Sequence, residues 1–162
     1  MALMSFFKPK WQHRDPEVRR QAVQALTSED AEILTRVARE DEAPAVRRLA
    51  IRRLSDLDLM LTVSAEDDDR DIRQFAHTRL SELLAGTHET SPTLDIRMEF
   101  LSRHLDADLL DFVALNGVEA ELRRSAQDRI TREYVLRDIA IKDTVLANRQ
   151  SALVRITDCS IL

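Results

Sequence analysis

The chain has 162 residues and a formal net charge of −5, with 44% hydrophobic and 33% charged residues. This composition is typical of one folded domain with a buried core and excludes a disordered chain. Only two Gly and four Pro occur, so we expect helices joined by tight turns rather than a β-sandwich. No stretch approaches the ~20 apolar residues of a membrane span, and we expect no membrane partner.

The single cysteine, Cys159, excludes a disulfide within the chain and a zinc site built from cysteines. A reducing compartment is the simplest explanation. The first residues contain a short apolar run, but no basic segment precedes it and no small-residue cleavage site follows, so they do not resemble a signal peptide. We therefore expect a cytoplasmic protein.

One phrase recurs along the chain: an aliphatic residue, Arg, two variable residues, Ala, three variable residues, an aliphatic residue, and Ser or Thr. The fourth copy has Phe100 in place of Ala, and the sixth copy is weaker. The arginines of successive copies lie 28, 26, 24, 26 and 26 residues apart, which indicates a helical repeat. These arginines are Arg19, Arg47, Arg73, Arg97, Arg123 and Arg149.

A second phrase lies between the copies and predicts a short helix with an apolar stripe at positions i, i+3 and i+4. The stripes begin at Leu34, Leu61, Leu110 and Leu136. Acidic residues cluster after this helix, where carboxylates favour the start of the next one. Each unit is therefore predicted to be two antiparallel helices, of which the Arg-containing helix carries the first phrase.

The period breaks once, in the segment 86–93, which reads Gly-Thr-His-Glu-Thr-Ser-Pro-Thr. We expect an irregular, exposed and mobile loop there, in place of one outer helix. The sixth copy stops before its second phrase, so we expect residues 1–162 to form a single repeat domain that is the N-terminal part of a longer array.

Residues 15–19 (Asp-Pro-Glu-Val-Arg) and 69–73 (Asp-Arg-Asp-Ile-Arg) resemble the second helix of HEAT-like repeats. The resemblance covers nearly the whole chain. It implies an all-α fold, a right-handed α–α superhelix (HEAT/ARM-like solenoid) of about six short repeats, with the Arg helices lining its concave side. Residues 6–12, followed by Asp-Pro-Glu-Val-Arg, also resemble the start of bacterial proteins that carry domain of unknown function 349. That resemblance implies no known activity.

The six repeat arginines fall inside the apolar arc of their helices when residues are placed about 100° apart. A buried guanidinium needs an anionic partner. Acids one turn earlier (Asp15, Asp69, Glu119) or acids of the next repeat could supply it. We interpret the six arginines as a structural ladder, with a phosphate or acidic-ligand site as the alternative. On this interpretation Arg73 contributes more to stability than Arg79, which is expected to be exposed.

A second set of side chains is expected to project away from the apolar arc as a partner-binding face. It suggests a non-enzymatic scaffold for an acidic or helical protein segment, including one from a longer parent chain. The alternative is a nucleic-acid backbone, as in a DNA-repair type of HEAT-like protein, although the chain is acidic and the face holds one aromatic residue. The set is Arg20, Arg48, Arg52, Arg53, Phe75, Arg79, Arg124, Arg129 and Arg155.

No Gly-rich phosphate loop and no recognisable nucleophile setting occur in the sequence. His88-Glu89 resembles the His-Glu pairs that ligate iron in HEAT-repeat deoxyhypusine hydroxylases, but that family requires several such pairs and this chain has one. We therefore expect no metal site, no cofactor, no catalytic residues and no enzymatic activity.

Overall fold

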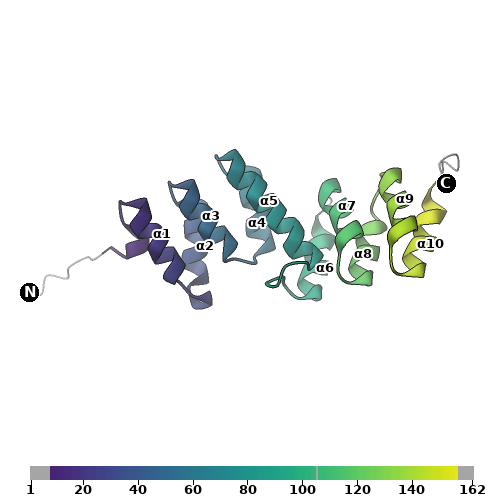
Figure 1. Ribbon diagram of the computed structural model, residues 1–162, viewed down its shortest axis with the longest axis horizontal. Coiled ribbons are helices and arrows are strands. Elements are labelled where there is room, and N and C mark those ends of the chain that lie inside the picture. The colour runs from purple at the N-terminus through teal and green to yellow at the C-terminus, as the bar shows by residue number, and fades with distance from the viewer. Residues whose placement is uncertain (1–7, 105, 157–162) are drawn as a thin grey trace, which may run out of the picture. The chain divides into compact units, whose positions relative to one another are not determined.

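The computed structural model describes residues 8–104 and 106–156, which form ten α-helices and two short 3-10 helices and contain no strand (Figure 1). The predicted all-α fold is confirmed. The chain divides into two compact units, Met1–Arg79 and Leu80–Leu162, which are described separately below. A superhelical solenoid and a single domain over 1–162 stay predictions.

The first unit contains the Arg helices α1 (Pro16–Ala25), α3 (Pro44–Arg52) and the start of α5 (Arg70–Ala85). Between them lie α2 (Ala31–Glu40) and α4 (Leu57–Glu66), which carry the second phrase and are called second helices below. Two short 3-10 helices, η1 (Lys10–Gln12) and η2 (Ser28–Asp30), precede α1 and α2. Both α1 and α2 pack against α3, so successive Arg helices lie side by side in this unit (Figure 1).

The start of α1 is defined by Asp15 and Pro16. The Oδ1 atom of Asp15 accepts a hydrogen bond of 2.9 Å from the backbone N–H of Glu17, and Pro16 occupies the first helical position. A carboxylate here satisfies one of the free N–H groups of the first turn, and Pro has no N–H to satisfy. The core of the unit is aliphatic, with Val23, Ile51 and Met60 fully buried.

The second unit contains the end of α5, the Arg helices α6 (Leu94–Arg103), α8 (Ala120–Gln127) and α10 (Leu146–Arg155), and the second helices α7 (Ala107–Asn116) and α9 (Glu133–Lys142). Here α8 packs between α6 and α10, and α7 packs against α9. The pairs α7–α8 and α9–α10 also pack together. The unit therefore has a row of Arg helices beside a row of second helices.

Residues 86–93 form no helix, as the break in the period predicts. The segment opens at Gly86, whose φ of +80° suits a residue without a side chain. A Cβ at this position would collide with the guanidinium of Arg97. Arg97 Nε also donates to the carbonyl of Pro92 at 3.0 Å, so Arg97 binds one end of the loop and lies close to the other. The mobility of the loop stays a prediction.

Candidate partner-binding surface

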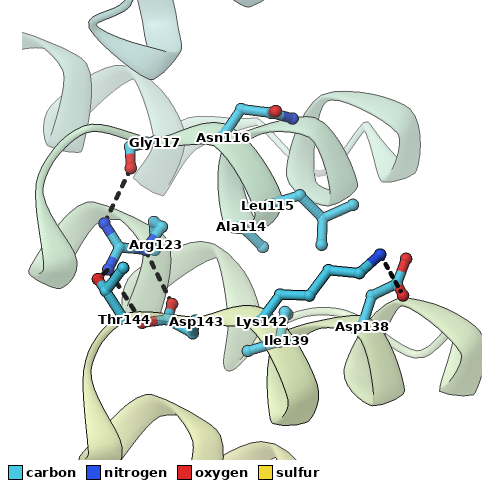
Figure 2. A pocket seen from close by; sticks show the side chains of 10 residues that line it. All are labelled: Ala114, Leu115, Asn116, Gly117, Arg123, Asp138, Ile139, Lys142, Asp143 and Thr144. Carbon is cyan, nitrogen blue, oxygen red and sulfur yellow. Dashed lines mark hydrogen bonds and ion pairs between the residues drawn. The ribbon is translucent and has the colours of Figure 1, made fainter.

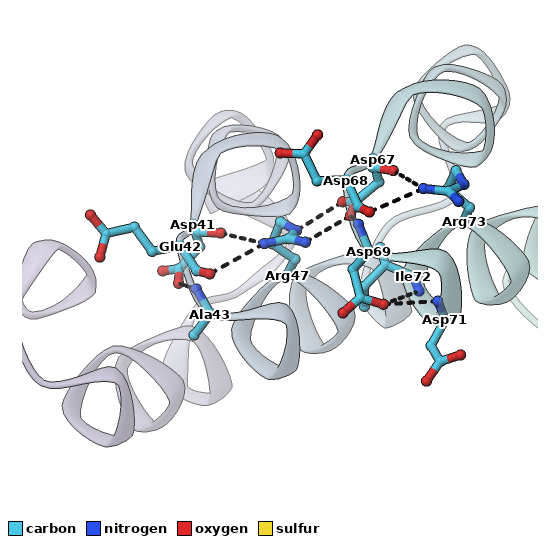
Figure 3. Close-up of polar contacts among 10 residues, drawn as sticks. All are labelled: Asp41, Glu42, Ala43, Arg47, Asp67, Asp68, Asp69, Asp71, Ile72 and Arg73. Atoms are coloured by element: carbon cyan, nitrogen blue, oxygen red, sulfur yellow. Dashed lines mark hydrogen bonds and ion pairs between the residues drawn. The ribbon is translucent and has the colours of Figure 1, made fainter.

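The repeat arginines of the first unit join consecutive helix pairs. Arg19 donates from Nε and Nη2 to the two carboxylate oxygens of Asp41, at 2.7 and 2.8 Å. Arg47 binds Asp67 in the same bidentate way, at 2.8 and 2.7 Å (Figure 3). These side chains are about nine-tenths buried or more. The Asp carboxylates are the largest cause of the raised pKa of Arg19 and Arg47, so both guanidinium groups stay charged.

The remaining Nη1 of each arginine binds the backbone of its own repeat. Arg47 Nη1 donates to the carbonyl of Asp41 at 2.8 Å, and Arg73 Nη1 donates to that of Asp67 at 2.5 Å (Figure 3). Asp41 and Asp67 end the second helices α2 and α4, and each side chain also accepts from the N–H two residues later. Asp41 and Asp67 thus each fix a turn and neutralise the repeat arginine of the preceding Arg helix.

The second unit repeats the arrangement with one variation. Arg123 binds both oxygens of Asp143, at 2.8 and 3.0 Å. Arg97 instead binds Glu119 at 2.8 and 2.6 Å, because Gly117 occupies the position that Asp41, Asp67 and Asp143 occupy in three other repeats. Hydrogen bonds from Arg97 hold the pKa of Glu119 below its ordinary value despite partial burial.

The structural ladder is therefore found at four of its six arginines, with carboxylates supplied by the next repeat. The acids one turn earlier do not pair with the arginine of their own repeat: Asp15 and Asp69 cap helix starts. Glu119 is a ladder carboxylate, but it binds Arg97 of the preceding repeat. In the described part of the chain, Arg73 and Arg149 bind backbone carbonyls and have no carboxylate within ion-pair distance. The sequence signal for the true partners is an acid 20 to 22 residues after the arginine.

Four arginines of the expected partner-binding face have a structural role instead and form a second structural set. Each lies six residues after a repeat arginine and donates to two carbonyls at the end of the preceding Arg helix. Arg79 Nη2, for example, binds the carbonyls of Arg52 and Leu54 at 3.1 and 3.3 Å. The last carbonyls of a helix lack partners within the helix, so a cation suits this position. The set consists of Arg53, Arg79, Arg129 and Arg155.

This finding corrects the expected partner-binding face. Arg79 is 6% exposed, whereas Arg73 is half-buried, the reverse of the ranking expected from the sequence. A helical wheel records only the helix that carries the residue, and it cannot show that the end of α3 covers Arg79. Arg53 and Arg79 are 26 residues apart, as are Arg129 and Arg155. This repeat spacing is the sequence feature that could have indicated a structural role for the set.

The remaining five residues of the expected partner-binding face differ in whether their side chains bind neighbouring residues. Arg20 pairs with Glu17 at 2.7 Å and lowers the pKa of that carboxyl to about 2. Arg124 pairs with Asp128 at 2.8 Å and is half-buried.

The other three lie together in the first unit. The guanidinium of Arg48 stacks over the ring of Phe75, 4.3 Å from its centroid. Arg52 is exposed and makes no side-chain hydrogen bond or ion pair with any residue that the structure describes. Arg48, Arg52 and Phe75 are called the Arg48 surface below.

A cleft of about 450 Å³ in the second unit lies beside the ladder, between the ends of α7 and α9 (Figure 2). Its cations are already engaged: Arg123 binds Asp143, and Lys142 Nζ donates to Asp138 at 2.8 Å. An equivalent cleft in the first unit lies beside Arg19 and includes Trp11. Both clefts follow from the geometry of the ladder, and nothing in their linings favours a particular ligand.

Comparison of the chain with protein-family models, curated proteins and solved structures finds no match. Within residues 8–104 and 106–156, no helix combines the length and the apolar character needed to cross a membrane. The same residues contain no group of three His, Cys, Asp or Glu side chains that could hold a metal ion. His88 Nδ1 accepts a hydrogen bond of 3.1 Å from the N–H of Thr90.

Replacing a ladder arginine should destabilise the fold strongly. Arg47→Ala leaves the buried carboxylate of Asp67 without its bidentate partner, and we expect the free energy of unfolding in urea to fall by about 3–5 kcal/mol. Arg52→Ala, on the same helix and exposed, should cost less than about 0.5 kcal/mol. Equal losses in the two variants would contradict a structural role of the ladder.

The carbonyl-binding set should also contribute to stability. Arg79→Ala removes the donor to two carbonyls at the end of α3, and we expect a loss of about 1–3 kcal/mol in the free energy of unfolding. Arg70→Ala is the matched control, because Arg70 is exposed on the same helix α5. If thermal and urea unfolding do not distinguish Arg79→Ala from Arg70→Ala, the assignment of this set is wrong.

Stability should depend on the ionisation of Asp143. Hydrogen bonds from Arg123 lower its pKa from 3.8 to about 2 and outweigh the opposing effect of burial. Because the folded pKa is the lower one, the ionised pair stabilises the fold above pH ~4, and this contribution of about 2 kcal/mol is lost as the pH falls toward ~2.

Urea unfolding measured at several pH values across this interval tests the coupling. The stability of Asp143→Asn should fall less steeply with acid than that of the wild type. Asp138→Asn is the control, since it removes the same charge five residues earlier, within α9, at the exposed ion pair with Lys142. An unchanged slope in Asp143→Asn would contradict the prediction.

Proposed function

We propose that this chain is a non-enzymatic helical-repeat scaffold whose Arg48 surface binds an acidic segment of another protein. The observation that carries the proposal is that Arg52 is exposed and has no side-chain hydrogen bond or ion pair with a described residue. The buried arginines of the same unit are paired with carboxylates or bound to carbonyls. Helix α3 contains Arg47, Arg48 and Arg52 and no acidic residue, so its exposed side is cationic.

The energetics of α3 support an anionic partner. Arg48 and Arg52 are four residues apart and therefore neighbours on one side of the helix, where like charges repel by a few tenths of a kcal/mol. A carboxylate from a partner removes this repulsion and gains two charge-assisted hydrogen bonds. The stacking of Arg48 on Phe75 holds its guanidinium plane in a fixed orientation, which lowers the entropy lost on binding.

The wider architecture belongs to the same proposal. A right-handed HEAT-like superhelix would place the Arg helices on its concave side, and the packing of successive Arg helices in each unit supports this. A cytoplasmic location is proposed from the single cysteine. The second candidate, a nucleic-acid backbone, is supported by the same exposed arginines, but the formal charge of −5 disfavours it.

Fluorescence anisotropy with two probes tests the proposal: a fluorescein-labelled peptide rich in Glu and Asp, and a labelled single-stranded oligonucleotide. We expect the peptide to bind, and Arg52→Glu to weaken its binding at least about fivefold. Arg39→Glu is the matched control, because it makes the same charge change at an exposed position of the second helix α2.

The outcome separates the candidates. An equal loss in Arg39→Glu would mean that only net charge matters, and the Arg48 surface would not be a site. Tighter binding of the oligonucleotide, with an affinity that falls steeply with salt, would support the nucleic-acid alternative instead.

A further inference from the structure

The second unit exposes large hydrophobic side chains, and three of them lie on α10. Leu146, Leu153 and Val154 are 57%, 43% and 86% exposed. In the described residues of the first unit, by contrast, no large hydrophobic side chain is exposed. Exposed hydrophobic side chains are therefore a feature of the second unit, with three of the eight on α10, and not a general property of the repeat.

Leu153 occupies a position that other repeats bury. It lies four residues after the repeat arginine, and in four of the five other copies this position is no more than 2% exposed. For Val23, Leu101 and Gln127, the following Arg helix packs against the helix that carries the residue: α3 against α1, α8 against α6, and α10 against α8. The four buried residues are Val23, Ile51, Leu101 and Gln127.

The same side of α10 carries a repeat arginine with half of its usual partners. Arg149 Nη1 donates to the carbonyl of Asp143 at 2.9 Å, as other ladder arginines do within their own repeats. Its Nε and Nη2 bind no carboxylate among the described residues, whereas those of Arg123 bind Asp143 at 2.8 and 3.0 Å. An apolar position and a cationic donor pair thus lie next to each other.

We propose that this face of α10, formed by Arg149 and Leu153, is an interaction surface for two amphipathic helices of another polypeptide. The first of these helices ends in an Asp that binds Nε and Nη2 of Arg149. The second covers Leu153 with aliphatic side chains. The partner therefore has the chemistry that α9, Asp143 and α10 present to α8 in this chain.

A second copy of this chain fits the surface poorly. The position that corresponds to Asp143 at the start of the described chain is His13, six residues before Arg19, and a neutral or cationic imidazole does not replace a carboxylate. The first unit also offers no large exposed hydrophobic side chain among its described residues. A symmetric pairing of two α10 helices would bring two Arg149 side chains together, which is repulsive.

Binding in trans is the first test. The probe is a fluorescein-labelled peptide of residues 131–156, which contains α9, Asp143 and α10, and anisotropy is measured with the full 162-residue chain. We expect saturable binding that Leu153→Asp in the protein weakens at least about tenfold. Arg149→Gln in the protein and Asp143→Asn in the peptide should each weaken it about fivefold, and together not much more, because both remove one ion pair.

Arg39→Gln in the protein is the control for charge and should leave the affinity unchanged. Arg52→Glu should also leave it unchanged, because this surface is separate from the one in the proposed function. Binding that is insensitive to Leu153→Asp and Arg149→Gln would overturn the proposal.

A test in cis covers the case in which the peptide does not fold by itself. A copy of residues 131–156 inserted after Ile156 places the second Asp at position 169, which is 20 residues after Arg149, as Asp143 is after Arg123. We expect the midpoint of urea unfolding to rise, and to rise less when the copied Asp is Asn.

The two tests decide together. Absence of binding in trans and of stabilisation in cis would show that the face accepts no helix pair, and the proposal would fall. Sedimentation that shows a dimer of the wild-type chain, abolished by Leu153→Asp, would overturn the proposed occupant in favour of a second copy. Failure of these tests leaves the Arg48 surface untouched, since its own test uses a different variant.

Discussion

A guanidinium buried between consecutive helix pairs is the constraint on which both units depend. Burying an unpaired charge costs several kcal/mol, so each buried arginine needs an anion at a fixed place. Arg19 and Arg47 in the first unit, and Arg97 and Arg123 in the second, find it in the following repeat. Neighbouring helix pairs are therefore held in register by a directional contact as well as by aliphatic packing.

The planar fork of arginine explains why this residue and not lysine occupies the ladder. One guanidinium binds the carboxylate through Nε and Nη2, while Nη1 reaches a carbonyl at the end of the preceding second helix. A lysine ammonium has no second edge with which to do both. The chain has 24 basic residues, of which only three are Lys, and the two structural sets account for much of this excess.

The sequence predicted the helices and their period well, because the apolar stripes and the spacing of the arginines depend on local geometry. It predicted less well which arginines are buried. Arg47 was assigned correctly because its burial follows from its own helix. Arg79 was assigned wrongly because its burial depends on the end of α3, which is 25 to 27 residues away in the chain. The sequence left the carboxylate partners undecided for the same reason. Acids one turn before the arginine and acids in the next repeat were equally consistent with the pattern.

The division of the arginines into structural and exposed sets limits what composition says about binding. Arg47, Arg79, Arg123 and Arg124 are paired with carboxylates or bound to carbonyls inside their own unit, so a count of arginines overstates the cationic surface. What remains differs between the units: the first exposes Arg48 and Arg52 beside Phe75, and the second exposes aliphatic side chains such as Leu153. A cationic surface responds to salt, whereas an apolar surface gains affinity from buried area. The same repeat therefore supports cationic and apolar contacts with partners. Which of the two occurs depends on the few exposed side chains that take no part in the structural ladder.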